Sequence, residues 1–197
     1  MSIKEDILEQ LVEEYLLHQG YFIQHNIKFR PRGDHPDFAT KQDSNHSDID
    51  VVGIHPRRNG VDRVVAVSCK SWQGGFNPRA ELEAIRQNKI VSGRERWRTF
   101  RELVSPKWAA AFLDRMEELN RTRSFKYITA VTRIDGDKIL WEEHAEFRER
   151  LAGNPIEVLD LRQLLATVLP GLTTTVANTN IGRLLQLIKA AGVTIKT

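Results

Sequence analysis

The sequence predicts an α/β protein with a mixed central sheet flanked by helices and a helical insertion. Short segments rich in Val and Ile, bounded by polar turn residues, are typical of strands. Longer segments between them carry apolar residues at helical spacing. The expected order is helix, three strands, helix, insertion, strand, helix, strand and helix. With 197 residues, 41% of them hydrophobic, the chain can form one domain with a real core.

The N-terminal part of the chain predicts one helix and one strand. Residues 4–19 are expected to be helical because their apolar side chains recur on one face, with Ser2 as the N-cap and Gly20 as the stop. Residues 21–29 alternate in polarity and predict a short strand. The following residues, 31–47, are polar and rich in turn formers, so we expect a loop there.

A hairpin is the next predicted feature, with strands at residues 49–54 and 64–72. The dipeptide Asn59-Gly60 between them is a strong hairpin-turn signal. Residues 78–90 then predict a helix, for which Asn77 is the expected N-cap and Pro78 the first residue.

The second half of the chain predicts an insertion and a return to the sheet. Residues 94–120 have a helical composition, and we place an insertion at about 92–122 within a domain that spans residues 1–172. A polar linker and a final helix make up residues 173–197. Between insertion and linker we expect a strand at 125–132, a helix at 139–151, a strand at 155–159 and a helix at 160–168.

Two charged residues of the hairpin are the most informative in the chain. Asp50 begins the first strand and Lys70 ends the second, so their side chains can meet at one end of the sheet. Because side chains alternate along a strand, Ser68 lies on the same face as Lys70. A lysine in an otherwise apolar strand needs a reason, since an unpaired buried charge is costly.

This arrangement resembles the PD-(D/E)xK nuclease superfamily, in particular the Mrr-type restriction endonucleases. Residues 8–21 look like the first helix of the family, with Glu9 at its acidic position. The Ser-Asp-Ile-Asp sequence at 47–50 is similar to the family's Gly-Gly-Ile-Asp element. Residues 67–72, Val-Ser-Cys-Lys-Ser-Trp, are similar to Val-Gln-x-Lys-x-Trp. The chain departs from the family at Ser68, where the family has Glu or Gln.

The resemblance implies a restriction-endonuclease-like fold and a role for each matching residue. Asp50 would be the central ligand of Mg²⁺ or Mn²⁺, and Ser68 would stand in for a second ligand. Lys70 would orient or activate the attacking water, or stabilise charge on the phosphate. Glu9 would act through the outer shell of the metal. Mg²⁺ prefers such oxygen ligands and keeps several waters.

Structural roles remain open for the same residues. Lys70 could form an ordinary ion pair with Asp48 or Asp50, and Ser68 could be a small core residue. Other side chains could supply the functions in doubt: Glu13 in place of Glu9, and Gln73, Glu81 or Glu83 in place of the missing ligand at 68.

Basic residues form two groups that could contact DNA. Lys28, Arg30 and Arg32 precede the Asp50 segment. The insertion carries a second cluster, Arg94, Arg96, Arg98 and Arg101, of which Arg94 and Arg98 are the expected DNA contacts. Such residues contact phosphates without reading sequence. The net charge of +3 is compatible with nucleic acid without requiring it.

The sequence therefore predicts a metal-dependent DNA endonuclease that hydrolyses phosphodiester bonds, with restriction or phage defence as its setting. The alternative is a weak or inactive nuclease-fold protein that binds nucleic acid or a partner protein. The single cysteine and the lack of a long apolar segment favour a cytoplasmic protein with no membrane association. The insertion or the last helix could form a homodimer interface.

Overall fold

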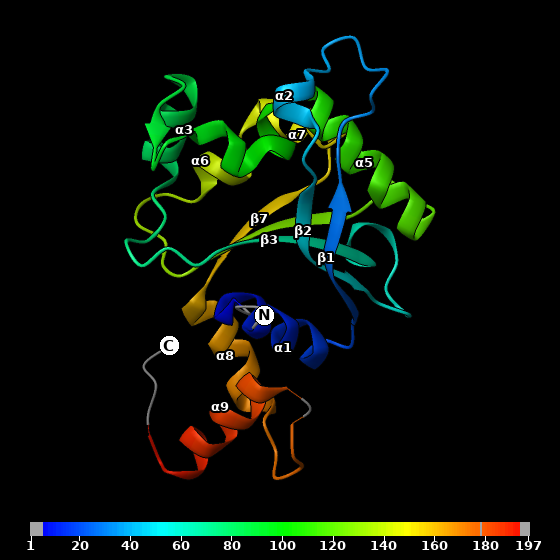
Figure 1. The fold of residues 1–197 in the computed structure, drawn as a ribbon. Helices are drawn as coiled ribbons and strands as arrows, with labels where there is room; N and C mark the ends of the chain where they lie inside the picture. Colours follow the sequence, from blue (N-terminus) through cyan, green and yellow to red (C-terminus); the bar gives the residue numbers. More distant parts are fainter. Residues whose placement is uncertain (1–5, 178, 194–197) are drawn as a thin grey trace.

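A five-stranded sheet divides the protein into two helical layers (Figure 1). The computed structural model describes residues 6–177 and 179–193. The strand order is β1-β2-β3-β6-β7; β1, β2 and β3 pair antiparallel, whereas β3, β6 and β7 pair parallel. This confirms the predicted mixed sheet flanked by helices. The strands are β1 (Phe22–Phe29), β2 (Ser47–Ile54), β3 (Val64–Lys70), β6 (Lys126–Val131) and β7 (Ile156–Asp160).

One layer consists of α1 (Ile7–His18), α8 (Leu161–Gly171) and α9 (Asn180–Ala190), which lie below the sheet in Figure 1. The apolar stripe of α1 packs against one face of the sheet in a core that also contains Ile181 and Leu185 of α9. The last helix therefore shares this core. The N-cap of α1 is Asp6, whose carboxylate accepts a hydrogen bond from the Leu8 amide (2.8 Å). Ser2, the predicted cap, lies outside the described residues.

The other layer is built largely from the insertion and covers the opposite face. It contains α3 (Pro78–Arg86), α4 (Arg101–Val104), α5 (Pro106–Asn120), α6 (Ile139–Glu142) and α7 (Ala145–Arg150). The insertion begins with a two-stranded hairpin, β4 (Ile90–Val91) and β5 (Arg94–Glu95), and a 3₁₀ turn, η2 (Arg96–Phe100). Its helices are part of the core, because Trp108, Phe112 and Met116 of α5 are almost fully buried.

The predicted hairpin is confirmed: β2 and β3 pair antiparallel and are joined by residues 55–63, which contain Asn59-Gly60. Gly60 begins the 3₁₀ turn η1 (Gly60–Asp62). Two other local predictions were wrong. The predicted loop contains a short helix, α2 (Thr40–Asp43), whose Asp43 is buried against Lys107 and Trp108. The predicted helix at 139–151 is divided in two, because His144 has an extended backbone and begins a new helix.

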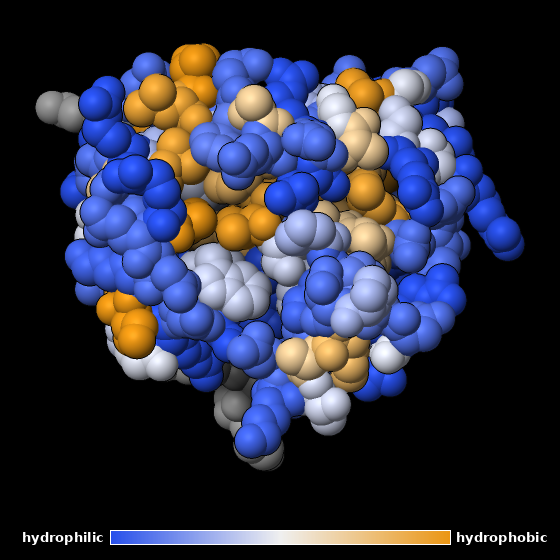
Figure 2. All heavy atoms as spheres, turned by 90° about the horizontal axis from the view of Figure 1, so that it is seen from above, coloured by the Kyte–Doolittle hydropathy of each residue, from blue (hydrophilic) through white to orange (hydrophobic). Residues whose placement is uncertain are grey.

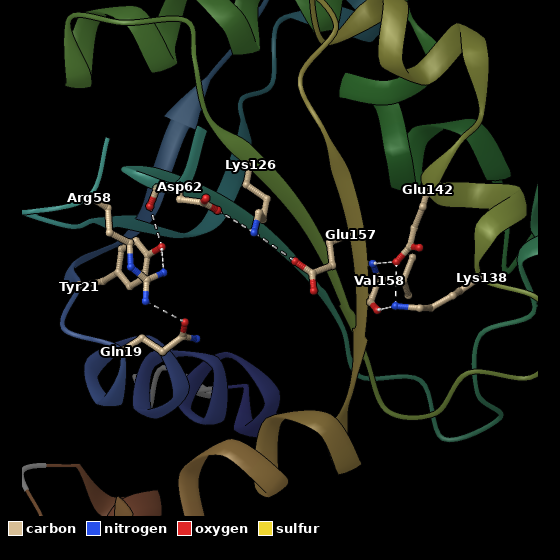
Figure 3. A network of polar contacts seen from close by, with 9 residues as sticks. All are labelled: Gln19, Tyr21, Arg58, Asp62, Lys126, Lys138, Glu142, Glu157 and Val158. Carbon is tan, nitrogen blue, oxygen red and sulfur yellow. Dashed lines mark hydrogen bonds and ion pairs between the residues drawn. The ribbon is translucent and has the colours of Figure 1, made fainter. Parts of the chain in front are cut away.

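A polar network holds the connection between β2 and β3 against neighbouring elements (Figure 3). The Tyr21 hydroxyl donates to the Asp62 carbonyl and accepts from Arg58, both at 2.8 Å. Lys126 of β6 then bridges Asp62 (2.9 Å) and Glu157 of β7 (3.6 Å). These contacts fasten the connection across the sheet.

The face seen from above is mostly hydrophilic, and its apolar side chains appear in several separate groups (Figure 2). Among the described residues, no helix is long and apolar enough to cross a membrane.

Candidate active site

The site lies where β2 and β3 stop pairing. Their last paired residues at this end are Val51 and Val67. Just beyond, the Asp50 side chain takes the place of a backbone acceptor: its Oδ2 accepts a hydrogen bond from the Cys69 amide (2.6 Å). The two strands therefore separate at the point where Asp50, Ser68 and Lys70 begin, and the Asp50 carboxylate is held between them.

Lys70 contacts three groups in this opening. Its Nζ donates to Ser68 Oγ at 2.7 Å and lies 4.0 Å from Asp50 Oδ2. The ring centroid of Phe100, from the insertion, is 5.7 Å from Nζ. Only 14% of the Lys70 side chain and 20% of the Asp50 side chain are exposed. The strand arrangement thus brings these charges together in a sheltered position.

Glu9 approaches the same charges from the first turn of α1. Burial, followed by the negative charges of Asp50 and Asp6, raises the pKa of Glu9 to about 7, although the Lys70 ammonium opposes this effect. The start of α1 is attached to the end of β3, because the Ser71 hydroxyl donates to the Asp6 carboxylate (2.5 Å).

Negative charge exceeds positive charge within the site. Burial also raises the pKa of Asp50, against the opposing effects of Lys70 and of the Cys69 amide. Two carboxyl groups, Glu9 and Asp50, thus share one ammonium group. A cation would relieve this excess.

The donor set fits a hydrated Mg²⁺ ion better than a closed cage. Asp50 and Glu9 provide carboxylate oxygens and Ser68 a hydroxyl oxygen, and Mg²⁺ commonly binds one or two carboxylates while keeping waters. Within residues 6–177 and 179–193, no three His, Cys, Asp or Glu side chains are arranged to hold a metal ion.

The alternative residues proposed from sequence have other partners. Asp48 pairs with Lys28 (3.3 Å), and Glu13 pairs with His25 (3.3 Å). Glu81 forms an ion pair with Arg96 (2.5 Å), and Glu83 forms one with Arg86 (2.7 Å). Gln73 is exposed.

Two buried residues near the site were not predicted. Tyr127 of β6 donates a hydrogen bond to the Glu102 carboxylate of α4, and its hydroxyl lies near Ser68. Burial and the Glu102 charge raise the pKa of Tyr127 well above its usual range, and the Glu102 charge also raises the pKa of Asp50. Sequence could not find Glu102, because no motif or spacing connects the insertion to Ser68.

The predicted basic residues lie in two places. Lys28, Arg30 and Arg32 line a groove beside α5 that also contains acidic residues. Arg94 and Arg98 belong to the hairpin and turn of the insertion. Arg32 and Arg98 are paired with Asp34 and Glu95, and Lys28 with Asp48.

Arg101, another arginine of the insertion, lies close enough to Arg94 and Arg98 for their charges to act on it. Burial, followed by the positive charges of Arg98 and Arg94, lowers the pKa of Arg101, although Glu102 opposes this effect. Arg101 stacks on Trp108, with 4.4 Å between its guanidinium carbon and the ring centroid. In the part of the chain that the structure describes, neither Arg30 nor Arg94 has an ion-pair partner.

Fold and site together define an α/β protein with a mixed sheet and an Asp-Lys pair at one end of it. Comparisons with protein-family models, curated proteins and solved structures found no match.

Proposed function

We propose that this protein is a metal-dependent DNA endonuclease with a restriction-endonuclease-like fold, acting in restriction or phage defence. The observation that carries the proposal is the Asp50-Lys70 pair, 4.0 Å apart, where two antiparallel strands separate. A structural ion pair needs no such opening, whereas a site for phosphodiester hydrolysis needs an anionic and a cationic group side by side.

Each residue has a task in this reaction. Asp50 and Ser68 would hold Mg²⁺ or Mn²⁺, which when bound supplies charge stabilisation and lowers the pKa of water. Lys70 would orient the attacking water or stabilise negative charge on the phosphate oxygens. Glu9, with its pKa raised to about 7, can accept or release a proton near neutral pH.

The backbone of the substrate would be bound by arginines of the insertion. Arg94 is exposed, and the positive charges of Arg94 and Arg98 both act on Arg101. The insertion also supplies Phe100, which contacts Lys70. DNA held by these arginines would therefore be next to the element that covers the site. Such contacts supply affinity rather than sequence preference.

A binding module without catalysis is the second candidate, and Ser68 favours it. Its hydroxyl accepts a hydrogen bond from Lys70, and it brings no charge to a metal. In that case the wild-type protein would bind DNA without cutting it, and metal binding would appear only after Ser68→Glu.

The decisive experiment is cleavage of plasmid and linear DNA with Mg²⁺ or Mn²⁺ by the wild type and by Lys70→Met. Lys41→Met is the control, since Lys41 is an exposed lysine of α2. We expect cleavage by the wild type and the control and none by Lys70→Met. If the wild type cuts DNA with neither metal, the proposed nuclease activity is rejected. Calorimetry with the metal alone and salt-dependent DNA binding would then test the module.

A further inference from the structure

The hairpin of β4 and β5, which follows α3 directly in the chain, stands out from the rest of the protein. All residues from 86 to 94 are exposed, which includes the whole of β4. The two residues of this strand, Ile90 and Val91, are apolar but are 68% and 37% exposed. In the part of the chain that the structure describes, β4 pairs with β5 and with no other strand. The core of the protein therefore does not explain why β4 is apolar.

The base of the hairpin is fixed next to the candidate site. Arg96, which follows β5, donates two hydrogen bonds to the Glu81 carboxylate of α3 (2.5 and 2.7 Å). Its guanidinium carbon also lies 4.1 Å from the ring centroid of Trp72, a residue that comes shortly after Lys70. The hairpin is thus anchored beside the end of β3, whereas its tip is free to contact another molecule.

The pairing of β4 with β5 places one apolar side chain on each face of the hairpin. Val91 is opposite Arg94, and Ile90 is opposite Glu95. Directly opposite residues of antiparallel strands point to the same face. Val91 therefore lies beside an exposed guanidinium group, and Ile90 lies on the other face. A partner that receives the tip of this hairpin would meet apolar groups on both sides.

Positive charge is concentrated around the same hairpin. Residues 86–101 contain six Lys or Arg side chains and one carboxylate, so their net charge of +5 exceeds the +3 of the whole chain. That carboxylate, Glu95, is paired with Arg98 (2.8 Å). Among residues 6–177 and 179–193, neither Lys89 nor Arg94 forms an ion pair. The surface therefore fits a polyanion that also offers small apolar groups, rather than an apolar protein surface.

We propose that the hairpin enters the major groove of DNA and that Ile90 and Val91 contact the methyl groups of thymine there. The major groove admits a two-stranded ribbon, and the thymine methyl is the apolar group on its base edges. Arg94 would bind a phosphate at the border of the groove. The hairpin would thus add a preference for thymine to the affinity that the arginines supply. The inference rests on the proposed binding of DNA but not on cleavage.

The test removes the methyl groups from the DNA, so that no binding sequence needs to be known. A duplex of mixed sequence with uracil in place of every thymine competes with the natural duplex in a gel-shift assay, without divalent metal. The hairpin variants are the double variant Ile90→Ser/Val91→Ser and the single variant Arg94→Gln. Val176→Ser is the matched control, because Val176 is an exposed valine (66%) of the connection between α8 and α9.

We expect the wild type to bind the uracil duplex at least about fourfold more weakly than the natural duplex, the factor for one buried methyl-sized group. The double variant should bind both duplexes equally. Arg94→Gln should bind both more weakly but keep the preference, because it loses only a phosphate contact. Val176→Ser should match the wild type.

Equal binding of the two duplexes by the wild type, or a preference that the double variant keeps, would overturn the proposal. So would a wild type that binds neither duplex, or a double variant that changes only the oligomeric state in light scattering. A cleavage assay separates this result from the nuclease. A wild type that prefers thymine but cuts no DNA would support the hairpin contact and reject the nuclease, and one that cuts DNA without the preference would do the reverse.

Discussion

Asp50 does two things with one carboxylate, because it accepts from the Cys69 amide and faces Lys70. Asp50→Ala should leave that partly buried amide without an acceptor and lower the free energy of unfolding by about 1–3 kcal/mol. Asp50→Asn keeps an oxygen for the amide but loses the charge. We expect it to be close to wild type in urea unfolding and to lack cleavage activity. Equal stability of Asp50→Ala and the wild type would contradict this assignment.

Glu9 gives the site a measurable dependence on pH. Its pKa rises from 4.5 to about 7 on folding, so between these values the folded state holds the proton more tightly than the unfolded state. Stability from this group is therefore lost as pH increases through that window. In urea unfolding, the wild type should lose more stability between pH 5 and pH 8 than Glu9→Gln does. Parallel pH curves would show that burial and the neighbouring charges do not raise the pKa of Glu9.

At the scale of single residues, part of the candidate site could be predicted from the sequence. Asp50, Ser68 and Lys70 could be placed together because strand alternation and hairpin geometry are local rules. Glu102 and Tyr127 could not, since they come near the site only after the insertion has folded over the sheet and β6 has paired with β3. Long-range packing of that kind leaves no periodic pattern in the chain.

The insertion is an element of the core as well as a cover for the site. Phe100 is fully buried and packs edge-to-face on Trp141, with 4.7 Å between ring centroids. Phe100→Ala should cost about 3–5 kcal/mol of unfolding free energy. Phe22→Ala, at a side chain that is 70% exposed, is the matched control and should be nearly neutral. Similar urea midpoints for the two variants would show that the insertion packs only loosely.

Elements with strong local signals were predicted well, and those fixed by tertiary contacts were not. The strands β2 and β3 lie close to their predicted limits because Val and Ile dominate them. The short helix α2 had no such signal, and its buried Asp43 is held by Lys107 and Trp108 from α5. The hairpin around Asn59-Gly60 was predicted, but the contact of its connection with a distant residue, Tyr21, at Asp62 was not.

For the whole molecule, the distribution of arginines matters more than the net charge of +3. Arg94→Gln should weaken binding to any duplex and reduce the slope of log affinity against log salt by roughly one. Arg123→Gln is the control, because Arg123 is neutralised by Asp114 and Glu117. Fluorescence anisotropy at several salt concentrations measures both. An equal slope for the two variants would place DNA elsewhere on the surface.

Strand β3 pairs antiparallel with β2, which precedes it in the chain, and parallel with β6, which follows the insertion. Glu9, Asp50, Ser68 and Lys70 all precede the insertion, whereas β6, the parallel partner of β3, follows it. During synthesis from the N-terminus, these four residues leave the ribosome before Tyr127 does. A nascent chain that ends within the insertion thus carries all four, while β3 still lacks its partner β6. Maturation of the site is coupled to translation of the second half of the gene.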